Sequence, residues 1–105
     1  MDTITFSKYS ARAEVVKAMA HPTRLFIIDE LLKNECSVLD LTRMIEADVS
    51  TVSKHLALLR SAGIVKIEKR GTQVFYSLKV PCLKNFIPCI EAVLENSAIE
   101  KRNCL

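Results

Sequence analysis

The sequence predicts one mainly α-helical domain with a small β-hairpin, in the order of four helices, two strands and a last helix (ααααββα). Its 105 residues suffice for a single core but are few for two. Hydrophobic residues make up 50% and charged residues 26% of the chain, with only two glycines and three prolines, which is typical of a helix-rich globule. The apolar residues also change from helical to alternating spacing after Gly63. We therefore expect residues 1–105 to form one domain.

Two helices are predicted in the first third of the chain. Apolar residues recur at helical spacing from Lys8 to Met19. A break follows, and Pro22 suits the first position of a second helix, because the N–H that proline lacks would have no helical partner there. The apolar pattern of this second helix fades at Asn34.

A helix-turn-helix is predicted next. A short third helix opens at Ser37 or Val38, and the polar stretch 46–48 separates it from a fourth helix that starts near Ser50. Serine and threonine at the start of the fourth helix can cap its free N–H groups. Gly63 ends this helix, since glycine readily adopts the left-handed conformation found after a helix C-terminus. Two helices joined by so few residues are typical of a helix-turn-helix.

A hairpin and a last helix complete the expected fold. The alternating segments 64–69 and 72–78, placed around Arg70-Gly71, predict a β-hairpin with a basic tip. Apolar residues then mark a last helix from Leu83 to Ala98. The polar tail that begins at Glu100 is expected to fray.

Basic charge is concentrated in the middle of the chain. Residues 49–79 hold six lysines and arginines against one acidic residue, whereas the net charge of the whole chain is only +3. A solvated face would have a similar composition. A basic segment that spans a helix and a hairpin also suits a surface that faces phosphates.

A helix-turn-helix followed directly by a basic hairpin is the winged helix-turn-helix arrangement. Its second helix enters the major groove of DNA, and its hairpin, the wing, lies along the backbone or the minor groove. Short polar side chains on the helix can reach base edges, while cations on the wing can contact phosphates. The candidate DNA-contacting residues are Ser50, Thr51, Ser53, Lys54, His55 and Arg60 on the fourth helix, with Lys69, Arg70 and Gln73 on the wing.

Three stretches of this region resemble the ArsR/SmtB family of winged-helix metalloregulatory repressors. They are "HPTRL" at the opening of the second helix, "VSTVSKHLALLRSAGIV" in the fourth helix and its exit, and "KRGTQVFYSL" in the wing. The resemblance covers residues 18–80. It implies a homodimer, paired through its first and last helices, that sits on an operator and blocks transcription until an inducer binds. Two recognition helices related by a two-fold axis would read a palindromic DNA operator.

The sensing sites of that family are altered in this chain. The arsenic-type site resembles "ELCVCDL", whereas this chain has "ECSVLDL", with Ser37 and Leu39 in place of the two cysteines. The zinc- and cobalt-type site needs aspartate and histidine on the last helix, and residues 83–98 contain neither. Asp29 occupies the position of one cysteine of the dithiol pair in reactive-sulfur sensors. The candidate ligands that remain are Cys82, Cys89 and Cys104, with Cys36 less favoured.

Three cysteines in one terminal segment favour a soft inducer and no permanent cofactor. As(III), as arsenite, or antimonite would suit three thiolates first, and cadmium or lead next. On a regular helix Cys82 and Cys89 would lie about 10 Å apart along the axis, too far for one ion. We therefore expect each to be completed by Cys104 or by the partner protomer. Two alternatives stay open: thiols that respond to oxidation or reactive sulfur, and cysteines that only fill apolar space.

Other classes of protein are disfavoured. No nucleophile motif, glycine-rich phosphate loop or CxxC pair predicts an enzyme. No apolar run is long enough to span a membrane, and the start lacks the pattern of a signal peptide, so we expect a cytoplasmic protein. A winged helix that serves only protein assembly is the more serious alternative, although such a protein would not need a basic wing.

Overall fold

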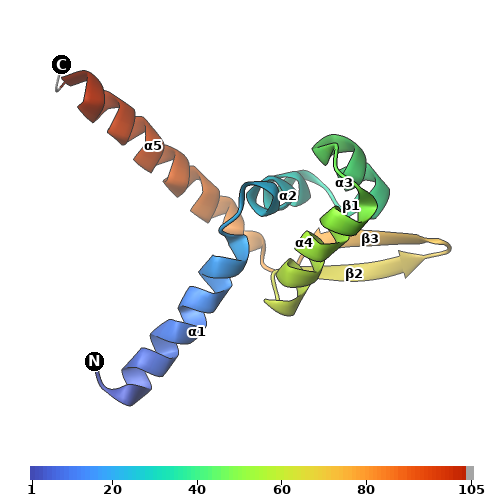
Figure 1. The fold of residues 1–105 in the computed structure, drawn as a ribbon, viewed down its shortest axis with the longest axis horizontal. Helices are drawn as coiled ribbons and strands as arrows, with labels where there is room; N and C mark the ends of the chain where they lie inside the picture. The colour runs from blue at the N-terminus through green and yellow to red at the C-terminus, as the bar shows by residue number, and fades with distance from the viewer. Residues whose placement is uncertain (104–105) are drawn as a thin grey trace.

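The computed structural model describes residues 1–103 and has the predicted order of elements (Figure 1). The α-helices are α1 (Thr3–Met19), α2 (Pro22–Lys33), α3 (Val38–Ile45), α4 (Val49–Ser61) and α5 (Phe86–Asn103). The strands are β1 (Cys36–Ser37), β2 (Val65–Arg70) and β3 (Gln73–Leu78), and a 3-10 turn, η1 (Pro81–Asn85), precedes α5. The helices α1 and α5 project from the body as two arms, on the side opposite to the β2–β3 wing (Figure 1).

The arm α1 begins earlier than its apolar spacing predicted. The expected start at Lys8 is wrong, because Asp2 caps the helix by accepting a hydrogen bond from the N–H of Thr5 at 2.7 Å. A side-chain cap fixes the start of a helix whether or not the first turns carry a core stripe. Ile4 and Phe6, which lie in these first turns, are exposed.

The wing belongs to a three-stranded antiparallel sheet of order β1-β3-β2. Strand β1 was not predicted, because two residues are too short to show an alternating pattern. The turn also differs by one residue from the expected Arg70-Gly71. Arg70 pairs with Gln73, so Gly71 and Thr72 form the turn. Gly71 has a φ of +64°, which places glycine at the first turn position, where a side chain would be strained.

The last helix differs from its expected bounds at both ends. A 3-10 turn occupies Pro81–Asn85, and α5 begins at Phe86 and continues to Asn103, so the expected fraying from Glu100 is not seen up to that residue. Pro88 does not interrupt α5, because it lies in the first turn, where backbone N–H groups have no helical partner.

The hydrophobic core lies between the second helix and the start of the wing. Helix α4 contributes Val52, Leu56 and Leu59 to this core, and each of them is fully buried. Among the described residues, α5 supplies none of the buried hydrophobic side chains and α1 supplies one. These side chains are Met19, Ile27, Ile28, Leu31, Cys36, Leu41, Val52, Leu56, Leu59, Ile64 and Val65.

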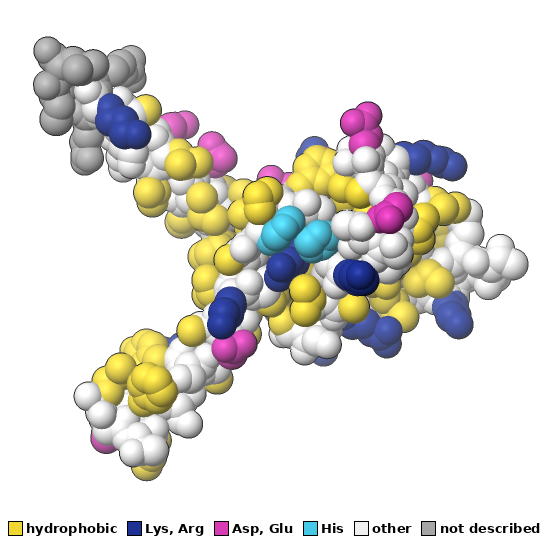
Figure 2. Space-filling model, viewed as in Figure 1, with side chains coloured by type: hydrophobic (Ala, Val, Ile, Leu, Met, Phe, Trp, Pro, Cys, Tyr) yellow, Lys and Arg dark blue, Asp and Glu magenta, His cyan; other side chains and the backbone are white. Residues whose placement is uncertain are grey.

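Both arms leave large hydrophobic side chains exposed, and Figure 2 shows such side chains along each of them. The most exposed in the middle of α5 are Val93 and Leu94, at 63% and 59%. Within residues 1–103, no helix has the length and apolar character needed to cross a membrane. The exposed set comprises Ile4, Phe6, Tyr9, Val15 and Val16 on α1, and Phe86, Val93 and Leu94 on α5.

Leu56→Ala should lower the free energy of unfolding by about 2–5 kcal/mol, because it removes a fully buried side chain and leaves a cavity beneath α4. Leu58→Ala is the matched control on the same helix, since Leu58 is 49% exposed, and it should cost less than about 1 kcal/mol. Urea unfolding at one fixed protein concentration measures both. Equal losses would contradict the packing of α4.

Candidate nucleic-acid interface

The helix-turn-helix is held by a cap at the start of each of its helices. Ser37 and Asp40 form a capping box at α3, with the Asp40 N–H donating to the Ser37 hydroxyl at 3.1 Å and the Ser37 N–H donating to the Asp40 carboxylate at 3.2 Å. α3 ends at Ile45, and its C-cap residue Glu46 has a φ of +59°, which turns the chain sharply toward α4. The two helices are thereby fixed across a turn of three residues, 46–48.

The cap of α4 is Asp48, and not one of the serines or threonines expected from the sequence. Its carboxylate accepts hydrogen bonds from the N–H of Thr51 at 3.0 Å and from the hydroxyl of Ser50 at 3.3 Å. These bonds, led by those from Thr51, lower the pKa of Asp48. Asp48 was missed because the serines and threonines just after it are equally good capping residues.

The outer side of α4 carries most of the predicted DNA contacts. Because its buried residues follow helical spacing, the opposite side faces solvent along the whole helix. The hydroxyls of serine and threonine and the ammonium of Lys54 lie in the first half of α4, and the guanidinium of Arg60 lies near its C-terminus. The exposed candidates are Ser50, Thr51, Ser53, Lys54 and Arg60.

His55 is half-buried, unlike the other candidates on α4. Its ring centroid lies 4.5 Å from that of His21, and Figure 2 shows the two histidines side by side. His21 caps α2, because its Nδ1 accepts the N–H of Thr23 at 3.0 Å. Burial, followed by the charges of His21 and Arg24, lowers the pKa of His55. His55 therefore packs α4 against the start of α2.

The wing exposes all three of its predicted DNA contacts, Lys69, Arg70 and Gln73, but Arg70 is engaged by other side chains. Its guanidinium donates to both carboxylate oxygens of Glu35 and, at 2.9 Å, to Glu68. These bonds lower the pKa of Glu68 and raise that of Arg70. Lys69 makes no ion pair with any residue in the described part of the chain.

Cys36 is buried in β1, which agrees with its low rank as a ligand. Its thiol donates to the carbonyl oxygen of Asn34 at 3.5 Å. Burial raises the pKa of this thiol, and the nearby carboxylates of Asp40, Glu30 and Glu35 raise it further. Because metals bind the thiolate form, a raised pKa disfavours Cys36 as a metal ligand.

Cys82 and Cys89 are both exposed near the base of the α5 arm. Cys82 lies in η1 and not on α5, so the spacing expected for one regular helix does not apply to this pair. The Cys89 thiol donates to the carbonyl oxygen of Asn85 at 3.2 Å. Cys104 lies outside the described residues. Among the side chains that the structure describes, no group of three or more histidines, cysteines or acidic residues lies where it could hold a metal ion.

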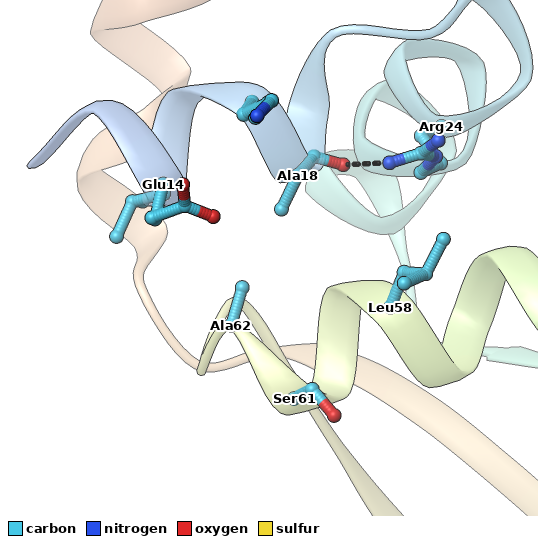
Figure 3. Close-up of a pocket in the computed structure, with 8 residues that line it drawn as sticks. Glu14, Ala18, Arg24, Leu58, Ser61 and Ala62 are labelled. Carbon is cyan, nitrogen blue, oxygen red and sulfur yellow. Dashed lines mark hydrogen bonds between the residues drawn. The ribbon is translucent and has the colours of Figure 1, made fainter. Parts of the chain in front are cut away.

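A hollow of about 520 Å³ separates α1 from the end of α4. Figure 3 shows Glu14 and Ala18 on one side of it, facing Ser61 and Ala62 on the other. At one end, Arg24 donates to the carbonyl oxygen of Ala18 at 2.8 Å (Figure 3). The α1 arm and the end of the recognition helix therefore line the same hollow. The lining residues are Glu14, Val15, Lys17, Ala18, Arg24, Leu58, Ser61 and Ala62.

The sequence of this region is similar to the sequences of known proteins. Residues 21–66 match the family model described as "Bacterial regulatory protein, arsR family". The chain is 42% identical over 88 residues to the transcriptional activator HlyU of Vibrio cholerae, which covers 83% of this chain and 82% of that protein. It is 33% identical over 82 residues to the transcriptional repressor PagR of Bacillus anthracis, covering 77% and 82%. A CadC homolog of Staphylococcus aureus, a cadmium resistance transcriptional regulatory protein, is 40% identical over 76 residues, covering 71% and 63%.

Solved structures share the fold. The crystal structure of NolR from Sinorhizobium fredii superposes with a TM-score of 0.81 at 25% identity, covering 89% of this chain and 93% of that one. A homodimeric winged helix-turn-helix DNA-binding domain from Mycobacterium bovis superposes with a TM-score of 0.79 at 23% identity, covering 93% and 91%. The winged helix-turn-helix fold expected from the sequence is confirmed.

Lowering the pH from 7.5 to 5.5 should destabilise the protein partly through His55. Because the folded state lowers the pKa of His55, the unfolded chain takes up the proton first, and stability is lost as the pH falls below about 6.5. In His55→Gln this share of the loss should disappear, as measured by urea unfolding at both pH values. His21 is present in both proteins, so an equal pH dependence would contradict the role given to His55.

Proposed function

Because the chain belongs to the ArsR family of bacterial transcriptional regulators, which are DNA-binding proteins and not enzymes, we propose that it is a dimeric repressor with a thiol-based inducer site. In this proposal α4 and the wing bind a palindromic operator. The repressor leaves the operator when a soft metal or metalloid engages exposed cysteines.

The main support for operator binding is the outer side of α4 beside the basic wing. The N-terminal half of α4 presents Ser53 and Lys54 to solvent, while the buried stripe fixes how the helix is rotated. A helix presented in this way can enter a major groove and hydrogen-bond base edges. Lys69 on the wing is exposed and has no ion pair with the described residues, so it can contact a phosphate.

The exposed apolar arms support the dimer. Large hydrophobic side chains line both α1 and α5, although the body of the molecule already has its own core. A second copy is the natural cover for two such arms, because a two-fold axis pairs equal surfaces. The dimer would also place two recognition helices on one operator, which raises affinity and specificity together.

The exposed thiols support the inducer site. Cys82 and Cys89 are open to solvent at the start of an arm that we assign to the dimer interface. Arsenite or antimonite bound there by three thiolates, with Cys104 or cysteines of the partner protomer completing the set, would change how the two arms are held. Because α1 and the end of α4 line one hollow, a displacement of the α1 arm would act on the recognition helix where the two helices meet. A tenfold change in DNA affinity needs only ~1.4 kcal/mol of coupling.

Lys69→Gln should weaken binding to operator and to unrelated DNA by a similar factor. It should also reduce the slope of log affinity against log salt concentration by about 1, because one phosphate contact is lost. Lys8→Gln removes the same charge from the α1 arm, opposite to the wing, and should change the slope little. A sequence-selective loss, or a native slope in Lys69→Gln, would contradict a phosphate contact by Lys69.

Cys89→Ser should bind the operator as the native protein does but should no longer release it when arsenite is added. A mobility-shift assay on the DNA upstream of the gene measures this, with antimonite, cadmium, lead, zinc and a polysulfide tested in parallel. Cys36→Ala is the matched control, since Cys36 is buried in β1, and it should keep the response.

Three results would redirect the proposal. Normal release by Cys89→Ser would remove Cys89 from the mechanism. A response to polysulfide and not to arsenite would favour the reactive-sulfur alternative, in which the same thiols are oxidised. Failure of the native protein to bind any DNA at low salt would favour a winged helix that serves protein assembly.

A further inference from the structure

Arg70 joins three segments of the chain at one face of the wing. Its guanidinium bonds both oxygens of Glu35, the second at 3.0 Å, and one oxygen of Glu68 at 2.9 Å. It also lies over the ring of Phe75, 4.9 Å from the ring centroid. Glu35 lies in the connection between α2 and β1, outside the hairpin. We call the group Glu35, Glu68, Arg70 and Phe75 the wing latch.

The register of the wing places Lys69 on the face opposite to the latch. Residues two apart on a strand share a face, so Glu68 and Arg70 point to one side, where Phe75 stands opposite Glu68. Lys69 lies between them in sequence and therefore points to the other side. The latch therefore lies on one face of the wing, and Lys69 lies on the other, which carries the core residue Val65 at the base of the hairpin. Near the wing tip Lys69 is exposed and can meet a phosphate.

The charges of the latch argue against a direct phosphate contact by Arg70. Two carboxylates face one guanidinium, so the group as a whole carries a charge of −1. A bidentate pair also occupies the fork with which arginine would hold a phosphate. A DNA phosphate would have to displace Glu35 and approach Glu68.

We infer that Glu35 is a positioning residue for DNA binding: through Arg70 it holds the tip of the wing against the α2–β1 connection. The inference rests on the proposed DNA-binding function. A two-stranded hairpin is marginally stable by itself, and β1 reaches only the part of β3 at Phe75 and Tyr76. The turn at Gly71 and Thr72 lies beyond that pairing, so the latch is the contact that holds this end of the wing.

Opposite charge changes should have the same effect on DNA binding. Glu35→Gln adds one positive charge to the protein and Arg70→Gln removes one, so a purely electrostatic effect would shift affinity in opposite directions. If both residues act by holding the wing, each variant should weaken operator binding at low salt between about twofold and fivefold. The double variant should be no weaker than either single one.

Asp29→Asn is the matched control for charge. Asp29 is exposed on α2 and outside the latch, and its replacement also adds one positive charge. This variant should bind the operator as well as the native protein or better. Circular dichroism melting of all four variants checks that each is folded.

Amide hydrogen exchange in the absence of DNA tests the latch independently. The amides of Gly71, Thr72 and Gln73 should exchange faster in Glu35→Gln and in Arg70→Gln than in the native protein, and at the native rate in Asp29→Asn. If the native protein binds no DNA, the proposed function fails, and hydrogen exchange alone decides whether the latch holds the wing.

Two outcomes would overturn the inference. Tighter operator binding by Glu35→Gln would mean that Glu35 only competes with phosphate for Arg70. Native exchange rates at the wing tip in both variants would mean that the contacts do not restrain the wing.

Discussion

The apolar contact between α4 and the body orients the recognition helix, and the other elements are arranged around it. Val52, Leu56 and Leu59 are fully buried, so α4 cannot rotate without exposing them and burying Ser53 or Lys54. Ile64 and Val65, which lead into the wing, belong to the same core. The shared core therefore fixes the orientation of α4 relative to the wing, and a DNA duplex would contact the two in this arrangement.

The core is too small to include the two long helices. Met19 is the one buried residue of α1, and the described part of α5 contributes none. The two longest helices of the chain, α1 and α5, therefore keep most of their hydrophobic side chains exposed in the single chain. In the proposed dimer a second copy would cover them, and the hollow beside α1 lies between this covered arm and the end of the recognition helix. This combination would suit regulation in the proposed dimer, because a change at the arms would alter the spacing of the two recognition helices.

The two neighbouring cations of the wing tip have different roles: Arg70 pairs with carboxylates of this chain, and Lys69 is proposed to contact DNA. The strand pleat sends Arg70 toward two carboxylates and Lys69 to the opposite face. A count of basic residues treats the two as equal, although only one of them lacks an acidic partner in the described structure. The same holds for His55, which shares the sequence of the recognition helix with Ser53 and Lys54 but packs against His21.

The sequence by itself determined the order of the elements, the helix-turn-helix and the hairpin, because apolar period, helix caps and the turn at Gly71 act over a few neighbouring residues. It also identified the outer side of α4, since burial of one stripe dictates the exposed one. Local signals failed at the start of α1 and at the two-residue strand β1. Only the tertiary structure decided that Glu35 meets Arg70, 35 residues away, that His21 meets His55, and that Cys36 is buried while Cys82 and Cys89 are exposed. Such contacts join residues that are distant in the chain, and no local pattern records them.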